Sequence, residues 1–407
     1  MARHPIAQYK NMKLGITLSG GGVRATVFHL GFLTRLAEAG LWDDLVHIST
    51  VSGGSLCAAL IFEKGSKKWP TKEAFFTECL PPIFKTLTTF NLQRAYLLDI
   101  FIKPWRLFQG RAHLIGMLIK KHWGVTSSVS EMPMQPRWTI NSTCYETGKN
   151  WRFSAKRMGG HLAHYVPSPD YPLSDAVASS AAVPGLIGPL KIRTEKYRWK
   201  EFKGQDLVDI NAIGKSITLW DGGVYDNLGV EALYKTGIGL RSDIDFLLVS
   251  DASKPLEVVE KKWIHNFPLP KSPKHFRLVD ISTDQVRSLR ARDLFSFFLK
   301  NKSGGYLRIG ESVKKIFQNL KIPLETIDPD RCLNNKDVFA AASFDTTLRK
   351  LSVEEFRLLF RHGYETCSAV LHCKRMTSFI HYDAEKFSWL LSNEKKRGIK
   401  CQTLQKM

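Results

Sequence analysis

Short apolar runs alternate with amphipathic segments along the first two thirds of the chain. Three of these runs predict β-strands, at residues 14–19, 45–51 and 246–250. A helix is predicted between the first two runs, where apolar residues recur at helical spacing at Val27, Leu30, Leu33 and Leu36. Strands that alternate with helices in this way are typical of a largely parallel sheet covered by helices. We therefore predict an α/β domain over about residues 13–255.

The same patterns predict further elements downstream. They are a β-hairpin from residues 137–144 and 150–154, and helices over residues 285–299 and 353–371. We expect residues 256–395 to form a helical region that completes or covers the α/β domain. Residues 396–407 are expected to form a basic tail.

A serine directly follows the second apolar run. Ser52 stands between that predicted strand and a segment of small residues, 55–60, which predicts a helix. On such a sharp strand-to-helix turn the hydroxyl is exposed at the end of the sheet, beside a helix N-terminus that favours negative charge. Only small neighbours fit the turn, so Gly53 and Gly54 support a nucleophilic serine. The alternative is a glycine-rich turn in which the serine is incidental.

Three glycines follow the first predicted strand. Gly20, Gly21 and Gly22 have no Cβ atoms, so the backbone N–H groups around them can converge on an anion. That anion could be a phosphate or a tetrahedral oxyanion. With Ala25, the segment also fits the dinucleotide fingerprint G-x-G-x-x-A. That alternative requires a carboxylate at the end of the second strand, which here ends at Ser52 instead.

A carboxylate stands at the end of another predicted strand, residues 216–220. It is Asp221, and Gly222 and Gly223 follow it. An Asp-Gly pair is also the commonest signal for a hairpin turn. Against a hairpin, residues 228–234 predict a helix rather than a returning strand. A carboxylate at the C-terminal end of a strand and before a helix lies where open α/β sheets place their chemistry.

Together, these segments resemble the patatin-like phospholipase family. That family has a G-G-G-x-R loop, then a G-x-S-x-G elbow, an A-S-x-A-x-P segment and a D-G-G/A triplet. The corresponding segments here are Gly20 to Arg24, Ser52 to Gly54, residues 175–189 and Asp221 to Gly223. The resemblance spans roughly residues 13–255, and Thr50 and Ala25 stand where the family usually has glycine.

The resemblance implies a three-layer fold with a mostly parallel central sheet flanked by helices, followed here by a C-terminal helical extension. It also implies a catalytic dyad in which Ser52 attacks an ester carbonyl and Asp221 takes its proton without a histidine. The N–H groups of the glycine loop would hold the oxyanion. Arg24 would brace that loop or face the phosphate of a lipid.

The activity implied by the resemblance is the hydrolysis of fatty-acyl esters of membrane lipids. Such an enzyme would be a phospholipase A or a lysophospholipase, and it would need no cofactor. The same dyad could also serve an acyltransferase or a neutral-lipid esterase. A further alternative is a catalytically silent module that binds membranes, and the presence of both Ser52 and Asp221 argues against it.

The chain is strongly basic. It has 59 Lys and Arg residues against 38 Asp and Glu residues, which gives a formal net charge of +21. Such an excess points to an anionic partner, either nucleic acid or a membrane surface. The sequence contains no recognisable nucleic-acid module, so we expect an anionic membrane surface as the partner and no nucleic acid.

One segment, residues 85–125, mixes basic side chains with bulky apolar ones. This mixture suits a cap over the active site or a surface that faces a membrane. The candidate membrane-binding residues are Lys103, Trp105, Arg106 and Arg111. The alternative for the same segment is a helical hairpin that belongs to the core.

Cysteines and the N-terminal residues bear on location. The seven cysteines form no C-x-x-C pair and no His/Cys metal spacing, so we expect free thiols and no metal site. The first residues are too polar for a secretory signal, and no run of about 20 apolar residues is present. We therefore expect a cytoplasmic protein that can associate peripherally with membranes.

Overall fold

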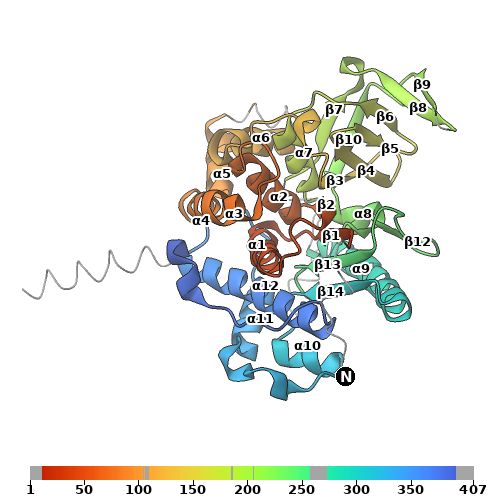
Figure 1. Ribbon diagram of the computed structural model, residues 1–407. Coiled ribbons are helices and arrows are strands. Elements are labelled where there is room, and N and C mark those ends of the chain that lie inside the picture. The colour runs from red at the N-terminus through yellow and green to blue at the C-terminus, as the bar shows by residue number, and fades with distance from the viewer. Residues whose placement is uncertain are drawn as a thin grey trace, which may run out of the picture.

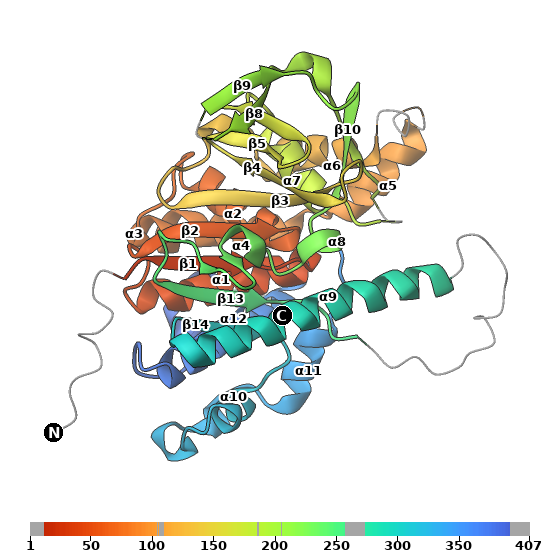
Figure 2. The same cartoon turned by 90° about the vertical axis from the view of Figure 1, so that its right-hand side faces the viewer.

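The computed structural model of the chain describes residues 12–103, 105, 110–184, 187–204, 206–256 and 273–390. One main sheet runs through the molecule, and helices pack on both of its faces (Figures 1 and 2). The predicted α/β architecture with flanking helices is thus confirmed.

Five parallel strands form the first half of the main sheet. In spatial order they are β14 (Gly304–Arg308), β13 (Phe246–Asp251), β1 (Leu14–Leu18), β2 (Leu45–Val51) and β3 (Arg137–Cys144). Every residue of β1 and β13 is buried, because helices cover both faces here. This burial explains why their sequences are nearly continuous apolar runs. The strands predicted at residues 14–19, 45–51 and 246–250 are confirmed as β1, β2 and β13, and β1 ends one residue earlier than predicted.

The second half of the sheet is antiparallel. Beyond β3 follow β4 (Lys149–Ser154), β5 (Arg157–Gly160), β6 (His164–Pro167), β8 (Trp199–Lys203) and β9 (Asp206–Ile210). β10 (Ser216–Asp221) pairs with both β3 and β7 (Leu190–Arg193). The predicted hairpin of residues 137–144 and 150–154 is confirmed as β3 and β4.

Helices form the outer layers of the fold. On one face of the sheet lie α1 (Gly22–Glu38), α2 (Gly53–Lys64) and α12 (Val353–Cys373), and on the other lie α8 (Gly223–Asp226) and α9 (Pro273–Asn301) (Figure 2). α1 and α12 cross at two glycines. A Cβ atom at Gly31 would lie 1.9 Å from the Phe360 carbonyl oxygen, and one at Gly363 would lie 1.9 Å from that of Phe28. The C-terminal part of the chain is therefore packed directly on the first helix.

The remaining helices extend these layers. They are α3 (Lys72–Ala74), the π-helix Phe75–Cys79, α4 (Leu80–Thr89), α5 (Leu92–Ile102), α6 (Arg111–Leu118), the π-helix Ile119–Trp123, α7 (Leu173–Ser180), α10 (Val313–Asn319) and α11 (Asn335–Ser343). The helices predicted at residues 285–299 and 353–371 are confirmed within α9 and α12. The basic tail at residues 396–407 lies outside the described residues.

The helix predicted at residues 228–234 is wrong. Only the single turn of α8 is α-helical here, followed by a 3-10 turn at Val230–Ala232 and the short strand β11 (Tyr234–Lys235), which pairs with β12 (Gly239–Leu240). The Asp226 carboxylate accepts hydrogen bonds from the backbone N–H groups of Leu228 and Glu231, and Gly229 has a φ of 66°. These bonds and the left-handed glycine end the helix after one turn.

Candidate active site

Two strands meet end to end along one edge of β3. β2 is parallel to β3 and places Val51 opposite Asn141, whereas β10 is antiparallel and places Asp221 opposite Ser142. The residue after Val51 is Ser52, so the serine and the aspartate arrive at the same point from opposite directions. Ser52 and Asp221 line the same cavity, and the Ser52 side chain is close enough to the Asp221 carboxylate to lower its pKa. The structure therefore brings together the two residues that the sequence predicts as a dyad.

The turn at Ser52 has a strained backbone. Ser52 has φ 49° and ψ −114°, which a non-glycine residue rarely adopts. Cβ atoms added at the next two positions would lie 2.3 Å from the Gly22 carbonyl oxygen for Gly53 and 2.2 Å from the Leu18 carbonyl oxygen for Gly54. Both glycines are thus required by the close approach of the neighbouring backbone.

Thr50 fits the turn although the family usually has glycine there. Its φ is not in the left-handed region. Its Oγ1 atom accepts hydrogen bonds from the Ser55 hydroxyl and from Trp138 Nε1, each at 3.0 Å. The threonine side chain therefore ties the end of β2 to both α2 and β3.

Ser180, at the end of α7, forms a hydrogen bond with the backbone of Ser52. Its hydroxyl accepts a hydrogen bond from the Ser52 backbone N–H at 2.9 Å and donates one to the Asn141 carbonyl at 2.7 Å. Residues 175–180 of α7 lie in the segment of residues 175–189, which the sequence marks as part of the family pattern. The sequence gives no separate signal for the role of Ser180.

Asp221 is held rigidly and is buried. Its N–H donates to the Ala182 carbonyl at 3.1 Å, and its Oδ1 atom accepts from the Gly223 N–H at 2.7 Å. Burial raises the pKa of Asp221 to about 7, and the hydrogen bond from Gly223 and the nearby Ser52 side chain limit this rise. Gly222 is needed because a Cβ atom there would lie 2.4 Å from the Asn141 carbonyl oxygen. The carboxylate thus has a pKa suited to a general base near neutral pH.

The glycine loop faces Ser52. A Cβ atom at Gly20 would lie 3.2 Å from the Ser52 Cβ, and Gly21 and Gly22 have φ values of 144° and 59°. The N–H of Gly20 donates to the Asn227 carbonyl at 3.1 Å, so it is not available to an oxyanion. Among the described residues, the N–H groups of Gly21, Gly22 and Gly53 meet no hydrogen-bond acceptor. These three donors lie around the nucleophile.

Arg24 braces the glycine loop from the interior. The side chain is 1% exposed, and its guanidinium donates to the carbonyls of Ala252, at 3.0 Å, and Phe344. Burial lowers the pKa of Arg24 to about 10, although Asp251 and Asp345 oppose this shift. The Arg24 side chain therefore ties the start of α1 to the segments that follow β13 and α11, and it also lines the smaller cavity at Ser52.

Two supports of the glycine loop come from distant parts of the chain. The Thr347 carbonyl accepts a hydrogen bond from the Val23 N–H at 3.0 Å, and a Cβ atom at Gly22 would lie 2.5 Å from that carbonyl oxygen. A Cβ atom at Gly20 would lie 2.3 Å from Asn227 Oδ1. Nothing local in the sequence marks Thr347 or Asn227 as part of the site, because each acts through a tertiary contact.

Ser52 lines two cavities of different character. We call the smaller one, about 370 Å³, the polar cavity because seven charged residues line it, among them Arg24, Asp221 and Arg287. We call the larger one, about 810 Å³, the apolar cavity: its lining includes Tyr96, Leu97, Ile115, Val183, Ile187 and Leu348, and its charged residues are Asp345, Arg349 and Glu355. The nucleophile therefore lies between a highly charged compartment and one with fewer charges.

The segment predicted to cap the site or face a membrane has one buried and one exposed helix. Most of α6 is buried, whereas α5 exposes four large apolar side chains: Leu97, Leu98, Phe101 and Ile102. Trp105 is 59% exposed, Lys103 is partly exposed and Arg111 is exposed, whereas Arg106 lies outside the described residues. Leu97 also lines the apolar cavity, so the exposed helix adjoins the site.

Histidines and metal-binding groups do not complete the site. In the described part of the chain, no histidine makes a hydrogen bond with Ser52 or Asp221, and no group of three or more His, Cys, Asp or Glu side chains could hold a metal ion. His29 is buried between Ser250 and the Ser19 carbonyl, and burial lowers its pKa to about 4. Among the described helices, none is long and apolar enough to cross a membrane.

Comparison with known proteins identifies the family suggested by the sequence motifs. The family model for patatin-like phospholipase matches residues 16–234. A patatin-like phospholipase domain-containing protein of Pyricularia oryzae (strain 70-15) is 24% identical over 221 residues, which are 49% of this chain and 25% of that protein. A protein of the same description from Chaetomium globosum is 25% identical over 187 residues, 44% of this chain and 19% of that protein. The matched regions thus cover a quarter or less of these relatives.

A solved structure shares the fold. Human GIVD cytosolic phospholipase A2 superposes with a TM-score of 0.50 at 14% sequence identity, over 91% of this chain and 61% of the human chain. At this identity the likeness shows the fold alone.

Proposed function

Because the chain belongs to the patatin-like phospholipase family, we propose that it hydrolyses fatty-acyl esters of phospholipids or lysophospholipids, with Ser52 as the nucleophile and Asp221 as the base. The observation that supports this proposal is the end-to-end meeting of β2 and β10, because Ser52 and Asp221 then line one cavity and burial raises the pKa of Asp221 to about 7. A pKa near neutrality lets the carboxylate accept a proton and later return it.

In the first half of the reaction, the enzyme is acylated. Ser52 Oγ bonds to the ester carbonyl carbon while its proton moves to Asp221. The carbonyl oxygen becomes an oxyanion, for which the N–H groups of Gly21, Gly22 and Gly53 are available donors. When the intermediate collapses, the C–O bond of the ester breaks and Asp221 returns the proton to the departing alcohol. The acyl group stays on Ser52.

In the second half, water releases the acyl group. Asp221 takes a proton from water as the water oxygen bonds to the acyl carbon, and the same donors hold the second oxyanion. Collapse then frees the fatty acid, and the proton returns to Ser52 Oγ. A single carboxylate can serve both halves because it begins and ends each half unprotonated.

The two cavities at Ser52 suit the two parts of a lipid. We assign the acyl chain to the apolar cavity of about 810 Å³ and the glycerol head-group side to the polar cavity of about 370 Å³. Arg287 in the polar cavity already pairs with the buried Asp251 at 2.9 Å, so it lines the cavity without being an isolated charge. The carbonyl to be attacked would then lie between the compartments, at Ser52.

The exposed face of α5 would place the protein on the lipid surface. Phe101 is 86% exposed and Ile102 is 64% exposed, which is unusual for adjacent large apolar side chains. We propose that this face inserts into the membrane interface, with Lys103 and Arg111 near anionic head groups. A lipid could then reach the apolar cavity along Leu97.

The test is hydrolysis of a lysophospholipid and of a short-chain ester by Ser52→Ala, Asp221→Asn and the double variant. Each single variant should lose at least about 10³-fold in kcat, and the double variant should be no worse than either, because both residues act in the same proton transfer. A control, Ser179→Ala, changes a buried serine on α7 whose hydroxyl contacts the Ala176 carbonyl and Ser142. Turnover near the wild-type level in either single variant would overturn the dyad. Acyl transfer to an alcohol with little hydrolysis would assign the same dyad to a transferase.

A further inference from the structure

A separate cavity of about 980 Å³ lies on the sheet, toward the opposite end of β2 from Ser52. It shares no lining residue with either cavity at Ser52. His47 in its wall precedes Ser52 by five residues on β2, which places the two residues roughly 16 Å apart at ~3.3 Å per residue. Small-molecule sites usually have volumes of about 300–1,000 Å³. The cavity is thus distinct from the proposed catalytic site and large enough for a small ligand.

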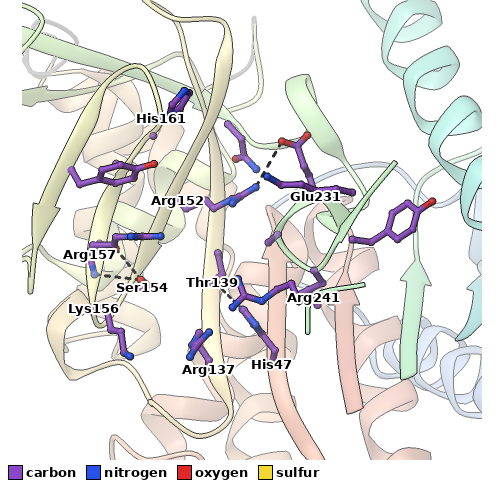
Figure 3. A pocket seen from close by; sticks show the side chains of 18 of the residues that line it. His47, Arg137, Thr139, Arg152, Ser154, Lys156, Arg157, His161, Glu231 and Arg241 are labelled. Atoms are coloured by element: carbon purple, nitrogen blue, oxygen red, sulfur yellow. Dashed lines mark hydrogen bonds and ion pairs between the residues drawn. The ribbon is translucent and has the colours of Figure 1, made fainter. Parts of the chain in front are cut away.

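Cationic side chains converge on this cavity from several strands and loops. Alternation along β3 and β4 places Arg137 with Thr139, and Arg152 with Ser154, on the face that forms its floor (Figure 3). The cations among its lining residues are Arg137, Lys149, Arg152, Lys156, Arg157, Lys235 and Arg241. Glu231 is the one Asp or Glu among these described lining residues. The lining therefore has a formal charge of +6, seven cations less one carboxylate.

Carboxylates of the protein neutralise this charge only in part. Asp243 lies 3.2 Å from Arg137 and 3.0 Å from Arg241, so one carboxylate serves two guanidinium groups. Glu231 reaches Arg152 at 3.8 Å. Within the part of the chain that the structure describes, ion pairs are absent at Lys149, Lys156, Arg157 and Lys235. The cavity thus has a surplus of positive charge that the fold itself does not balance.

His47 is buried beside these cations. Its side chain is 2% exposed, its Nε2 atom lies 3.0 Å from Thr139 Oγ1, and its Nδ1 atom has no partner among the described residues. Burial lowers the pKa of His47 to about 3, with further contributions from Arg241 and Arg137. The histidine is therefore neutral at physiological pH, in surroundings that favour an anion.

We propose that this cavity binds a small ligand with two or more phosphate groups. Guanidinium groups pair bidentately with phosphate oxygens, and a lysine adds a mobile point charge. More than one phosphate is required because the cations lie on different sides of the cavity, such as Arg241 after β12 and Arg157 on β5 (Figure 3). The Arg157 guanidinium lies 4.8 Å from the ring centres of both Tyr165 and Phe202, and these cation–π contacts hold it in place at the cavity.

The proposed ligand chemistry has two sources. A soluble polyphosphorylated compound and the head group of a polyphosphorylated lipid present the same phosphate groups. In either case the ligand binds away from Ser52, so the site adds to the proposed hydrolysis and does not depend on it. Binding should therefore persist in Ser52→Ala.

The test is calorimetric titration of the full chain with inositol trisphosphate, in the wild type and in Ser52→Ala. We expect both to bind, and we expect the double variant Lys156→Ala/Arg157→Ala and the single variant Arg241→Ala each to weaken binding by about tenfold or more. These side chains are exposed, so the variants should fold. The matched control Lys300→Ala/Lys321→Ala removes two exposed cations elsewhere and should stay within about twofold of the wild type.

Vesicles decide the source of the ligand. If it is a lipid head group, vesicles that contain phosphatidylinositol bisphosphate should sediment the protein, and soluble inositol trisphosphate should release it. If it is a soluble compound, inositol trisphosphate should bind and those vesicles should sediment the wild type and the cavity variants equally.

Three results would overturn the proposal. One is the absence of inositol trisphosphate binding to the wild type. Another is an equal loss in the cavity variants and in the Lys300→Ala/Lys321→Ala control, which would show attraction by net charge alone. The last concerns a single-stranded oligonucleotide. If its binding depends on the cavity residues and inositol trisphosphate does not compete with it, the cavity binds nucleic acid instead.

Discussion

The backbone N–H of Ser52 donates a hydrogen bond to the Ser180 hydroxyl at 2.9 Å, and the same hydroxyl donates to the Asn141 carbonyl at 2.7 Å. This chain of contacts fixes the turn that presents the nucleophile. We predict that Ser180→Ala lowers kcat by about 10–100-fold with a smaller effect on KM, because a small displacement of a reacting atom is costly. Steady-state hydrolysis of a short-chain ester measures both parameters.

Ser179→Ala is the matched control for this prediction. Ser179 is equally buried on α7, but its hydroxyl contacts the Ala176 carbonyl and Ser142 rather than Ser52. Both variants should lose stability, by roughly 1–3 kcal/mol for a buried hydrogen-bonding group. Only Ser180→Ala should lose turnover. Equal turnover in the two variants would show that Ser180 has no positioning role.

The pKa of Asp221 predicts opposite effects on activity and stability. Hydrolysis requires the carboxylate form, so kcat/KM should rise with pH and level off above about pH 7. Since the pKa is raised in the folded state, the folded protein holds this proton more tightly than the unfolded chain does. The contribution of this group to stability is therefore present at low pH and is lost as the pH rises from 3.8 to about 7.

Asp221→Asn should consequently be inactive yet more stable than the wild type at pH 8. The gain is at most about 4 kcal/mol, from roughly three pKa units, and it should shrink as the pH falls toward 4. Urea unfolding of both proteins at several pH values measures the difference. A gain that is independent of pH would contradict the raised pKa.

The crossing of α1 and α12 predicts a second sensitive position. A Cβ atom at Gly31 or Gly363 would lie 1.9 Å from a backbone carbonyl oxygen of the other helix. Gly31→Ala and Gly363→Ala should therefore each destabilise the protein by at least about 1–3 kcal/mol. Gly214→Ala is the control, because the nearest atom to its added Cβ is 3.9 Å away. Thermal unfolding separates the variants, and equal midpoints would mean that the helices do not cross so closely.

The exposed face of α5 predicts binding to lipid vesicles. Phe101→Asp/Ile102→Asp should reduce binding to anionic vesicles and hydrolysis of bilayer lipid, because two apolar side chains no longer enter the interface. Hydrolysis of a short-chain soluble ester should be unchanged. Leu299→Asp on α9, a residue that is 72% exposed, is the control. A loss of vesicle binding as large in the control as in the α5 variant would exclude α5 as the membrane contact.

Basic residues near α5 should also contribute to the binding of anionic vesicles. Reversal of charge at Lys103, Arg106 and Arg111 together should also weaken binding to anionic vesicles, by about 1 kcal/mol for each basic group near the surface. High salt should have a similar effect, because it shortens the Debye length. Co-sedimentation at two salt concentrations measures both effects, and equal binding to neutral and anionic vesicles would contradict this account.

The sequence predicts those parts of the fold and of the site that depend on neighbouring residues, such as apolar runs and glycines. Apolar runs determine β1, β2 and β13, and the glycines beside Ser52 and Asp221 mark turns that only small residues allow. For this reason both residues could be placed at strand ends from the sequence alone. The structure adds that the two strands share one edge of β3, which fixes their mutual position.

The features that cannot be predicted from the sequence depend on contacts between residues that are distant along the chain. Thr347 supports Gly22 from more than 300 positions away, and no local pattern signals that contact. The helix expected at residues 228–234 does not form, because the Asp226 carboxylate accepts a hydrogen bond from the Leu228 N–H and Gly229 has a left-handed backbone conformation. The cationic cavity was missed because its arginines are scattered along the sequence and meet only through the antiparallel half of the sheet.

Labelling with a fluorophosphonate probe is the most direct test of whether Ser52 is the catalytic nucleophile. An activated serine attacks the phosphorus atom and forms a stable covalent adduct, which mass spectrometry locates on a peptide. We expect a single adduct on Ser52 in the wild type, full labelling of Ser179→Ala, and no labelling of Ser52→Ala or Asp221→Asn. Failure of the wild type to react, or equal labelling of Ser52→Ala, would contradict this role for Ser52.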